Sequence, residues 1–381
     1  KGRRILLDFK MLHTYAEVFI GGRRAGELWF PGGELDVTDA AAPGSEQEII
    51  FRVSARPLNL VSASFSAPDR VEKTQASVKF RGITGDLYIR AVPKAQRLAD
   101  VQVVTSVKDH TITFAADTQG LGAGPYRLAA EIAGCGEKRF FKSNALVPDT
   151  NGVLRFSTLW RNPKLWDLHT PENRYAVQLT LTDDAGKLID ALTPVEFGFR
   201  EFEIRGRDFY LNGTPIHLRA LHNTTVNSLA DAACESSAVE MCRRVKEYGF
   251  NFLILGNYDF EPGCVSYLDG FLNACDQSGV LSSFSMPHIK DYDMDLNKPE
   301  VAAQYEALCR KLARLVRNRP SVILYAANHN ATGYFGDQNP LKIDGIFDMP
   351  ADSGKKGAWW EWARKQAWIS DALIKQADST R

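Results

Sequence analysis

The chain has 381 residues, more than one ordinary domain, which indicates two or three domains. Its 46 basic and 46 acidic side chains cancel, which argues against nucleic-acid or anionic-membrane binding, since such proteins carry a basic bias or patch. No apolar run approaches the length that spans a bilayer.

The six cysteines form no CxxC pair and have no metal-ligand spacing. Cys242, Cys275 and Cys309 fall at apolar positions of predicted helices, where we expect small buried side chains rather than a disulfide framework. Lys1 begins almost directly in a strand pattern and Arg381 follows a helix pattern, so we expect both ends to be cut, and the lack of a localisation signal here does not mean that the protein has none.

The first half of the chain predicts short strands separated by Gly-Gly, Pro-Gly and Asp-rich turns. A first series covers Arg4–Phe9, Ala16–Ile20, Ala25–Phe30, Glu48–Val53 and Asp86–Val92. A second series covers Val101–Ser106, Thr111–Ala115, Tyr126–Ile132, Lys138–Lys142, Gly152–Ser157 and Tyr175–Thr182. No helix-period run precedes about residue 235, so two all-β sandwiches are expected, joined by a linker at Pro93–Arg97.

The pattern changes after Phe199. Asn212-Gly213 predicts a hairpin turn between short strands, and a single strand is expected over Pro215–Leu221. Ser237-Ala-Val-Glu240 matches a capping box and predicts a helix start, with Gly249 as its C-terminal cap.

Strands and amphipathic helices then alternate to the end of the chain. Strands are predicted at Phe250–Leu255, Val280–Phe284 and Ser321–Ala327, and helices on the stripes that include Leu272, Leu312 and Leu373. This alternation indicates a parallel sheet, either a barrel or a doubly wound fold. No Gly-rich nucleotide fingerprint follows any of these strands, which disfavours a Rossmann fold.

Polar side chains follow four of the predicted strands, where a (β/α)8 barrel carries its chemistry. The candidate binding residues are His222, Asn223, Asn257, Tyr258, His288, Asn328 and Tyr334. The candidate catalytic residues are His329, Asn330 and Asp337. Asn can cap a turn and His is often structural, but four such strand ends together favour a polyol-binding cleft.

The expected loops have two further features. Asp291, Asp293 and Asp295 alternate but lack the Gly and Glu of an EF-hand loop, so a solvated acidic loop is the preferred interpretation. Trp359 and Trp360 could stack on sugar rings, although packing in the helix core fits Trp359 better. Nothing in the sequence requires a cofactor or a metal.

Several motifs resemble glycoside hydrolase family 2. Gly198-Phe-Arg200 and Phe209-Tyr-Leu-Asn-Gly-Thr-Pro-Ile-His-Leu-Arg219 look like the entry to its catalytic barrel. Asn162-Pro-Lys-Leu-Trp166 and Arg174-Tyr175 resemble its immunoglobulin-like module, and Ala16-Glu-Val-Phe-Ile-Gly21 with Glu34-Leu-Asp-Val-Thr38 resembles its jelly roll. Cys275-Asp276 with Gly279, and Arg319-Pro-Ser-Val-Ile-Leu324, match the segments around the third and fourth barrel strands.

The resemblance implies a multidomain architecture. It comprises a truncated jelly-roll β-sandwich over 1–95, an immunoglobulin-like β-sandwich over 96–198, and the N-terminal half of a (β/α)8 TIM barrel over 199–381. It also implies a secreted or periplasmic glycoside hydrolase with a carbohydrate substrate, and we expect exo action on a poly- or oligosaccharide. The sugar and the oligomeric state stay open.

The chain departs from the family pattern at the expected acid/base. Where the family has an Asn-Glu pair, this sequence has His329-Asn330, and Ile254 and Asn257 replace an Arg and a His. Asn has no titratable proton, so Asn330 cannot act as the general acid. Three interpretations stay open: proton transfer by His329 or Asp337, another mechanism, or a non-catalytic glycan-binding pseudoenzyme. The nucleophile belongs to a seventh strand that these residues do not reach.

Overall fold

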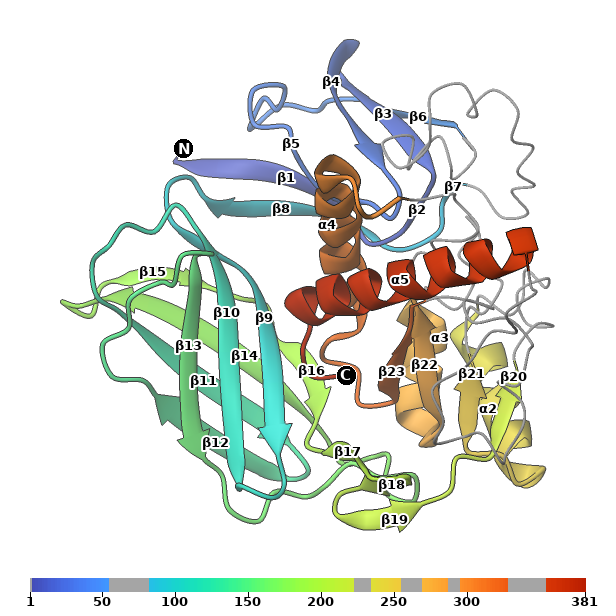
Figure 1. Cartoon of the computed structure of the whole chain (residues 1–381). Helices are drawn as coiled ribbons and strands as arrows, with labels where there is room; N and C mark the ends of the chain where they lie inside the picture. The colour runs from blue at the N-terminus through green and yellow to red at the C-terminus, as the bar shows by residue number, and fades with distance from the viewer. Residues whose placement is uncertain (1, 55–81, 223–233, 255–268, 287–294, 328–353) are drawn as a thin grey trace.

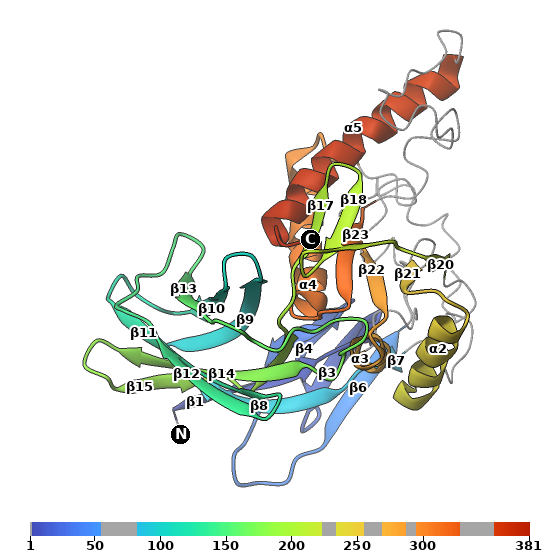
Figure 2. The same ribbon diagram turned by 90° about the horizontal axis from the view of Figure 1, so that it is seen from below.

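The computed structural model describes residues 2–54, 82–222, 234–254, 269–286, 295–327 and 354–381. Residues 2–54 and 82–222 form strands and turns, as the sequence predicts. Helices alternate with strands in the described residues after 234. Two antiparallel β units lie beside a unit of parallel strands and helices (Figure 1). Figure 2 shows α5 (Gly354–Ala377) projecting beyond the β units.

The first β unit consists of two three-stranded sheets around one apolar core. One sheet has the order β5-β1-β8 and the other β4-β3-β6. The strands are β1 (Arg3–Phe9), β3 (Tyr15–Ile20), β4 (Arg23–Trp29), β5 (Gly33–Asp36), β6 (Ile49–Ser54) and β8 (Leu87–Pro93), and β2 (Leu12–His13) pairs with β7 (Gly82–Ile83). Leu7 and Phe9 of β1 pack against Ala16 and Val18 of β3, because alternate side chains of both strands point between the sheets.

The second β unit is also a two-sheet sandwich. One sheet has the order β13-β10-β9, and the other β12-β11-β14-β15 with β16 also paired to β14. The strands are β9 (Arg97–Ser106), β10 (Thr111–Gln119), β11 (Tyr126–Gly134), β12 (Glu137–Lys142), β13 (Val153–Leu159), β14 (Arg174–Asp183), β15 (Leu188–Ala191) and β16 (Val195–Gly198). Phe114, Leu128 and Val177 are fully buried between the sheets.

The segment after Phe199 differs in part from the prediction. Asn212 and Gly213 have φ of 53° and 79° and form the predicted turn between β18 (Asp208–Leu211) and β19 (Thr214–Ile216), with β17 (Phe202–Arg205) on the other side of β18. The single strand expected over Pro215–Leu221 is wrong. Strand β19 ends at Ile216, and a separate strand, β20 (Ala220–His222), pairs in parallel with β21 (Phe252–Ile254). The chain has to change partners between these two strands, so one continuous strand cannot satisfy both pairings.

Four parallel strands are hydrogen-bonded in the order β20-β21-β22-β23, with β22 at Leu281–Ser285 and β23 at Val322–Ala326. The connecting helices are α2 (Glu235–Glu247), α3 (Asp269–Ser278) and α4 (Pro299–Val316), with α5 after β23. The predicted stripes are confirmed, and Cys242, Cys275 and Cys309 are buried free thiols within them.

The capping-box prediction is wrong. Helix α2 begins two residues before Ser237, after Cys234 in an extended conformation with no side-chain cap hydrogen bond. Ser237 is therefore the third helical residue rather than the cap, and the first hydrogen bond of the helix runs from the Ala238 N–H to the Cys234 carbonyl oxygen at 3.0 Å. Glu235 accepts a hydrogen bond from Gln277 of α3 at 2.6 Å, so a contact between helices accompanies the earlier start. The predicted cap at Gly249 is confirmed, with φ of 84°.

Side chains of both β units pack into the apolar core around the parallel sheet and its helices. Met11 and Phe30 of the first β unit belong to the apolar cluster formed by helices α2 to α5. Trp166, from the second unit, is fully buried and its indole N–H donates to the backbone oxygen of Asp276 at 3.0 Å. The boundary between the β modules and the parallel sheet is therefore a packed core rather than a hinge.

Asp276 connects three segments at this boundary. Its carboxylate accepts the Ser321 N–H at 3.0 Å and an Arg319 guanidinium N–H at 3.2 Å, and its side chain is 3% exposed. Burial lowers the pKa of Arg319, but the carboxylates of Asp276 and Asp269 raise it more, so the net shift is upward. Arg200 adds hydrogen bonds to the carbonyl oxygens of Pro320 and Val322. Burial, followed by the charge of Arg381, lowers the pKa of Arg200 to about 9, and it stays protonated at neutral pH.

The close approach at Gly279 can be tested against a matched glycine. Gly249 and Gly279 each follow a helix, and both have a positive φ. A Cβ added at Gly279 would lie 2.5 Å from the Leu168 carbonyl oxygen, whereas a Cβ added at Gly249 would meet no atom within 4 Å. We expect Gly249→Ala to cost about 1 kcal/mol of unfolding free energy for the left-handed backbone alone. Gly279→Ala should cost roughly 2 kcal/mol more, because the Leu168 segment has to move. Equal losses in urea unfolding would show that Leu168 does not approach Gly279 this closely.

The Asp276 contact can be tested by Asp276→Asn. The amide keeps an acceptor for Ser321 but leaves the Arg319 guanidinium without its buried charge partner, so we expect a loss of about 3 kcal/mol in unfolding free energy. The control is Asp371→Asn, which breaks an exposed ion pair to Lys375 and should cost less than about 0.5 kcal/mol. A loss at Asp276 no larger than that of the control contradicts the role given to this contact.

Candidate functional site

The candidate site lies at the carboxyl ends of the four parallel strands. Parallel pairing sets His222 of β20 opposite Ile254 of β21, and Ser285 of β22 opposite Ala326 of β23. Because neighbouring parallel strands end at the same edge, side chains from four separate segments meet there. The parallel pairings therefore put the carboxyl ends of β20, β22 and β23 along one edge of the sheet.

The two faces of this sheet have different neighbours. Val280, Phe284 and Met286 pack in the cluster that contains the helices, so this is the helix face. Leu281 packs instead with Phe252, Ile323 and Trp166, and we call this second surface the inner face. Since side chains alternate along a strand, Ser283 and Ser285 follow Leu281 onto the inner face, and Ser282 points to the helix face.

The inner face changes character along the strands. Near the amino ends it is apolar and filled by Phe252, Leu281 and Ile323, with Trp166 and Leu211 packed against them. Toward the carboxyl ends it carries the hydroxyls of Ser283 and Ser285, which are 5% and 1% exposed, and the half-buried imidazole of His222. A filled apolar end and a polar end suit a site at the carboxyl edge, where barrel enzymes hold substrate.

Of the residues predicted for the site, His222 falls within the described part of the chain, at the end of β20. The other predicted residues lie outside the described residues: Asn223, Asn257, Tyr258, His288, Asn328, His329, Asn330, Tyr334 and Asp337. The side chains of Trp359 and Trp360 are likewise outside the described set, as are Asp291 and Asp293. The predicted catalytic group therefore stays a prediction.

The sequence interpretation missed three residues of this region. Ser283 and Ser285 were assigned to the strand without a role, because the adjacent Ser282 removes any alternation of polar and apolar residues that could have marked them. Asn251 was also missed. Its side chain is 7% exposed, accepts the Arg219 N–H at 2.8 Å and donates to the His217 carbonyl at 2.9 Å, so it ties the segment before β20 to β21.

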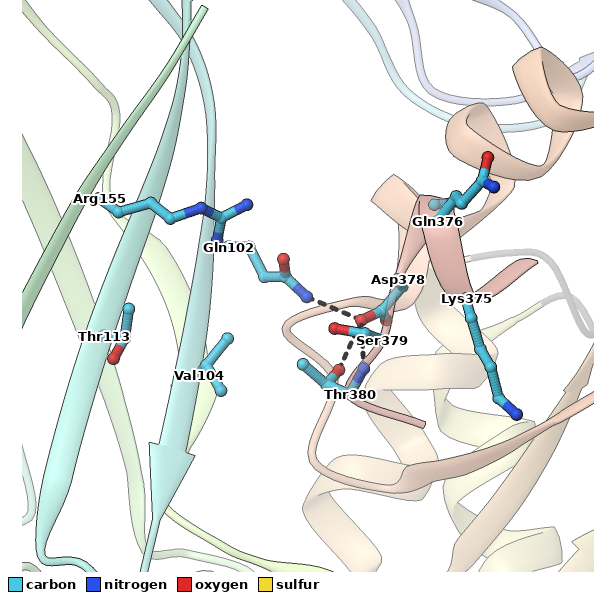
Figure 3. Close-up of a pocket in the computed structure, with 10 residues that line it drawn as sticks. Gln102, Val104, Thr113, Arg155, Lys375, Gln376, Asp378, Ser379 and Thr380 are labelled. Carbon is cyan, nitrogen blue, oxygen red and sulfur yellow. Dashed lines mark hydrogen bonds between the residues drawn. The ribbon is translucent and has the colours of Figure 1, made fainter. Parts of the chain in front are cut away.

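A separate pocket of about 260 Å³ lies between the second β unit and the end of α5 (Figure 3). Gln102, Thr113 and Arg155 line one side, and Asp378, Ser379 and Thr380 line the other. Asp378 accepts hydrogen bonds from Gln102 at 2.8 Å and from the Tyr325 hydroxyl at 2.6 Å. Burial raises the pKa of Asp378, but the Arg381 charge and the hydrogen bonds from Thr380 and Tyr325 outweigh it, so the net shift is downward and the carboxylate is charged at neutral pH. This pocket is part of the junction between units and contains none of the strand-end residues.

The described residues hold no group of three His, Cys, Asp or Glu side chains that could bind a metal ion. Within the same residues, no helix is both long and apolar enough to cross a membrane.

Comparison with known proteins shows which proteins this chain is similar to. Residues 96–200 match the sequence profile described as "Glycosyl hydrolases family 2". The beta-galactosidase of Photobacterium profundum is 25% identical over 189 residues, 49% of this chain and 18% of that protein. The beta-galactosidase of Enterobacter cloacae is 23% identical over 354 residues, 82% of this chain and 32% of that protein.

Solved structures of similar fold superpose on nearly the whole chain. A Bacteroides uniformis beta-glucuronidase superposes with a TM-score of 0.65 at 20% identity, over 100% of this chain and 44% of that one. A beta-D-mannosidase from Dictyoglomus thermophilum gives a TM-score of 0.68 at 20% identity, over 99% of this chain and 48% of that one. The chain spans 18–20% of the length of the first three curated relatives. In sequence and fold the protein resembles glycoside hydrolase family 2.

The role of Asn251 in holding β20 can be tested by Asn251→Ala. The change leaves the Arg219 N–H and the His217 carbonyl without their partner, and we expect a loss of about 1–3 kcal/mol in unfolding free energy. Asn297→Ala is the control, because the Asn297 amide donates to Asp295 at an exposed turn. If both variants unfold at the same urea concentration, Asn251 does not secure β20.

Proposed function

We propose that this chain is part of a glycoside hydrolase that cleaves O-glycosidic bonds of an oligo- or polysaccharide. The observation that carries the proposal is the shared fold: the two β units and the parallel sheet superpose together on glycosidase structures over 99–100% of the chain. The relatives and neighbours named above are galactosidases, glucuronidases and mannosidases, which supports a carbohydrate substrate.

In this proposal β20 to β23 are the first four strands of a (β/α)8 barrel. The β units are then the jelly-roll and immunoglobulin-like modules expected from the sequence. The apolar amino ends and the polar carboxyl ends of the inner face support placing the sugar at the carboxyl edge. The proposal includes exo attack on a chain end, and a secreted or periplasmic location fits a polysaccharide substrate.

Retaining hydrolysis needs a group that donates a proton to the leaving oxygen and a second carboxylate that attacks the anomeric carbon. Asn330 cannot donate that proton, so we assign the transfer to His329 or Asp337, which flank it in the sequence. An imidazole with an unperturbed pKa near 6.5 can both give and take a proton near neutral pH. The second carboxylate would come from residues beyond those described.

The second candidate is a glycan-binding protein without hydrolytic activity. The specific observation in its favour is Asn330 at the position where the family places its acid/base Glu. In this case the polar inner-face residues would hold a sugar, and the bound glycan would be released unchanged.

The test is hydrolysis of an oligosaccharide panel by the longer protein that contains this chain. We expect release of a monosaccharide, and a roughly 10²- to 10⁴-fold loss of kcat in either His329→Ala or Asp337→Ala, the range typical of general acid-base catalysis. The exposed His169→Ala and Asp184→Ala serve as matched controls and should keep full activity. Binding of a glycan without release of any sugar would establish the second candidate instead.

A further inference from the structure

We infer that the pocket between the second β unit and the end of α5 binds a small carboxylate that also carries hydroxyl groups, such as a monosaccharide acid. The pocket has a volume of about 260 Å³, and its walls are the sheet β13-β10-β9 and the residues at the end of α5 (Figure 3). Sites for drug-sized ligands have roughly 300–1,000 Å³, so this pocket limits its occupant to about one sugar unit. The inference goes beyond the proposed hydrolysis and does not depend on it.

The pocket lies toward the opposite edge of the parallel sheet from the proposed sugar site. Arg381 directly follows the pocket wall at Thr380, and its guanidinium donates to the carbonyl oxygens of Arg319 and Val322 at 3.0 and 2.8 Å. These two residues lie before and at the start of β23. The pocket is therefore anchored at the amino ends of the strands, and a ligand bound in it occupies a second site.

Arg155 gives the sheet wall of the pocket an unpaired positive charge. Its side chain extends from β13 toward the end of α5 (Figure 3), and no carboxylate of the described residues forms an ion pair with it. The other cations at this junction are paired: Arg314 and Arg317 with Asp117, Arg381 with Asp378, and Lys375 with Asp371. The remaining charge is positive, and the planar guanidinium can donate two parallel hydrogen bonds to one carboxylate.

The rest of the pocket offers neutral hydrogen-bonding groups. Gln102 donates its amide N–H to Asp378 at 2.8 Å, which leaves its amide oxygen as an acceptor. The hydroxyls of Thr113 and Ser379 lie on opposite walls. The last carbonyl groups of a helix have no helical donor and carry a partial negative charge, so the end of α5 adds further acceptors. Hydroxyl groups of a ligand can donate to these acceptors, whereas a second carboxylate there would be repelled.

The pocket is formed before a ligand enters. The hydrogen bond between Gln102 and Asp378 joins its two walls, and Asp378 also accepts the Tyr325 hydroxyl at 2.6 Å and the Thr380 hydroxyl at 2.6 Å. The Asp378 side chain is completely buried, so these partners hold it in place. A site whose walls are already fixed loses little conformational freedom on binding, which favours affinity for a small ligand.

The experiment measures equilibrium binding to the longer protein by calorimetry. The probes are three sugar acids, glucuronate, galacturonate and gluconate, with glucose and galactose as neutral counterparts and acetate as a carboxylate without hydroxyls. We expect at least one sugar acid to bind with a dissociation constant of about 1 mM or tighter, and the neutral sugars and acetate to bind more weakly.

Arg155→Gln should weaken binding of that acid about 10-fold or more, because charge-assisted hydrogen bonds to the carboxylate are lost. The matched control is Arg161→Gln, which changes an exposed arginine just after β13 that does not line the pocket, and it should bind as the wild type does. Thermal unfolding confirms that both variants are folded.

Three results would overturn the inference: no sugar acid binds, a neutral sugar or acetate binds as tightly as the acid, or Arg155→Gln binds the acid as tightly as Arg161→Gln. The last result also covers an acid that binds only at the strand ends. The proposed function is decided separately, since Arg155→Gln should hydrolyse the oligosaccharide panel at the wild-type rate. An acid bound through Arg155 without any hydrolysis would leave the inference standing and contradict the hydrolase.

Discussion

The arrangement of the chain depends on one buried carboxylate. Asp276 holds the Ser321 amide at the start of β23 and the Arg319 guanidinium through its side chain, and its backbone oxygen accepts the indole N–H of Trp166. An ionised carboxylate is stable in such a place only when its oxygens are paired, so its partners are obligatory. Through this residue helix α3, strand β23 and the second β unit are fixed to one another.

The packing around Asp276 explains why the units are not independent. Gly198 and Gly279 leave no room for a side chain, because a Cβ would lie 2.7 Å from Pro320 at the first and 2.5 Å from the Leu168 oxygen at the second. On the other side, Met11 and Phe30 enter the cluster of the helices. A sheet held from both sides keeps the ends of its strands in place, as the proposed sugar site at those ends would require.

The chemistry of the site follows from the same geometry. The second β unit closes the amino ends of the inner face with Trp166, so apolar side chains fill that end. The carboxyl ends carry the hydrogen-bonding side chains of His222, Ser283 and Ser285. Apolar packing is thus concentrated at one edge of the sheet and polar side chains at the other, where the sugar site is proposed.

The sequence by itself determined the local elements. The Asn212-Gly213 turn, the stripe of helix α4 and the glycines after α2 and α3 depend on neighbours within a few residues, and the structure confirms them. Tertiary structure decided the rest. A strand buried on both faces has no alternation of polar and apolar residues, so the pattern of β22 could not tell which serines face the site. The start of α2, the partner change between β19 and β20, and the partners of Asp276 depend on segments distant in the chain. Contacts of that kind leave no periodic mark in a sequence, because each is made by a single pair of residues brought together only by folding.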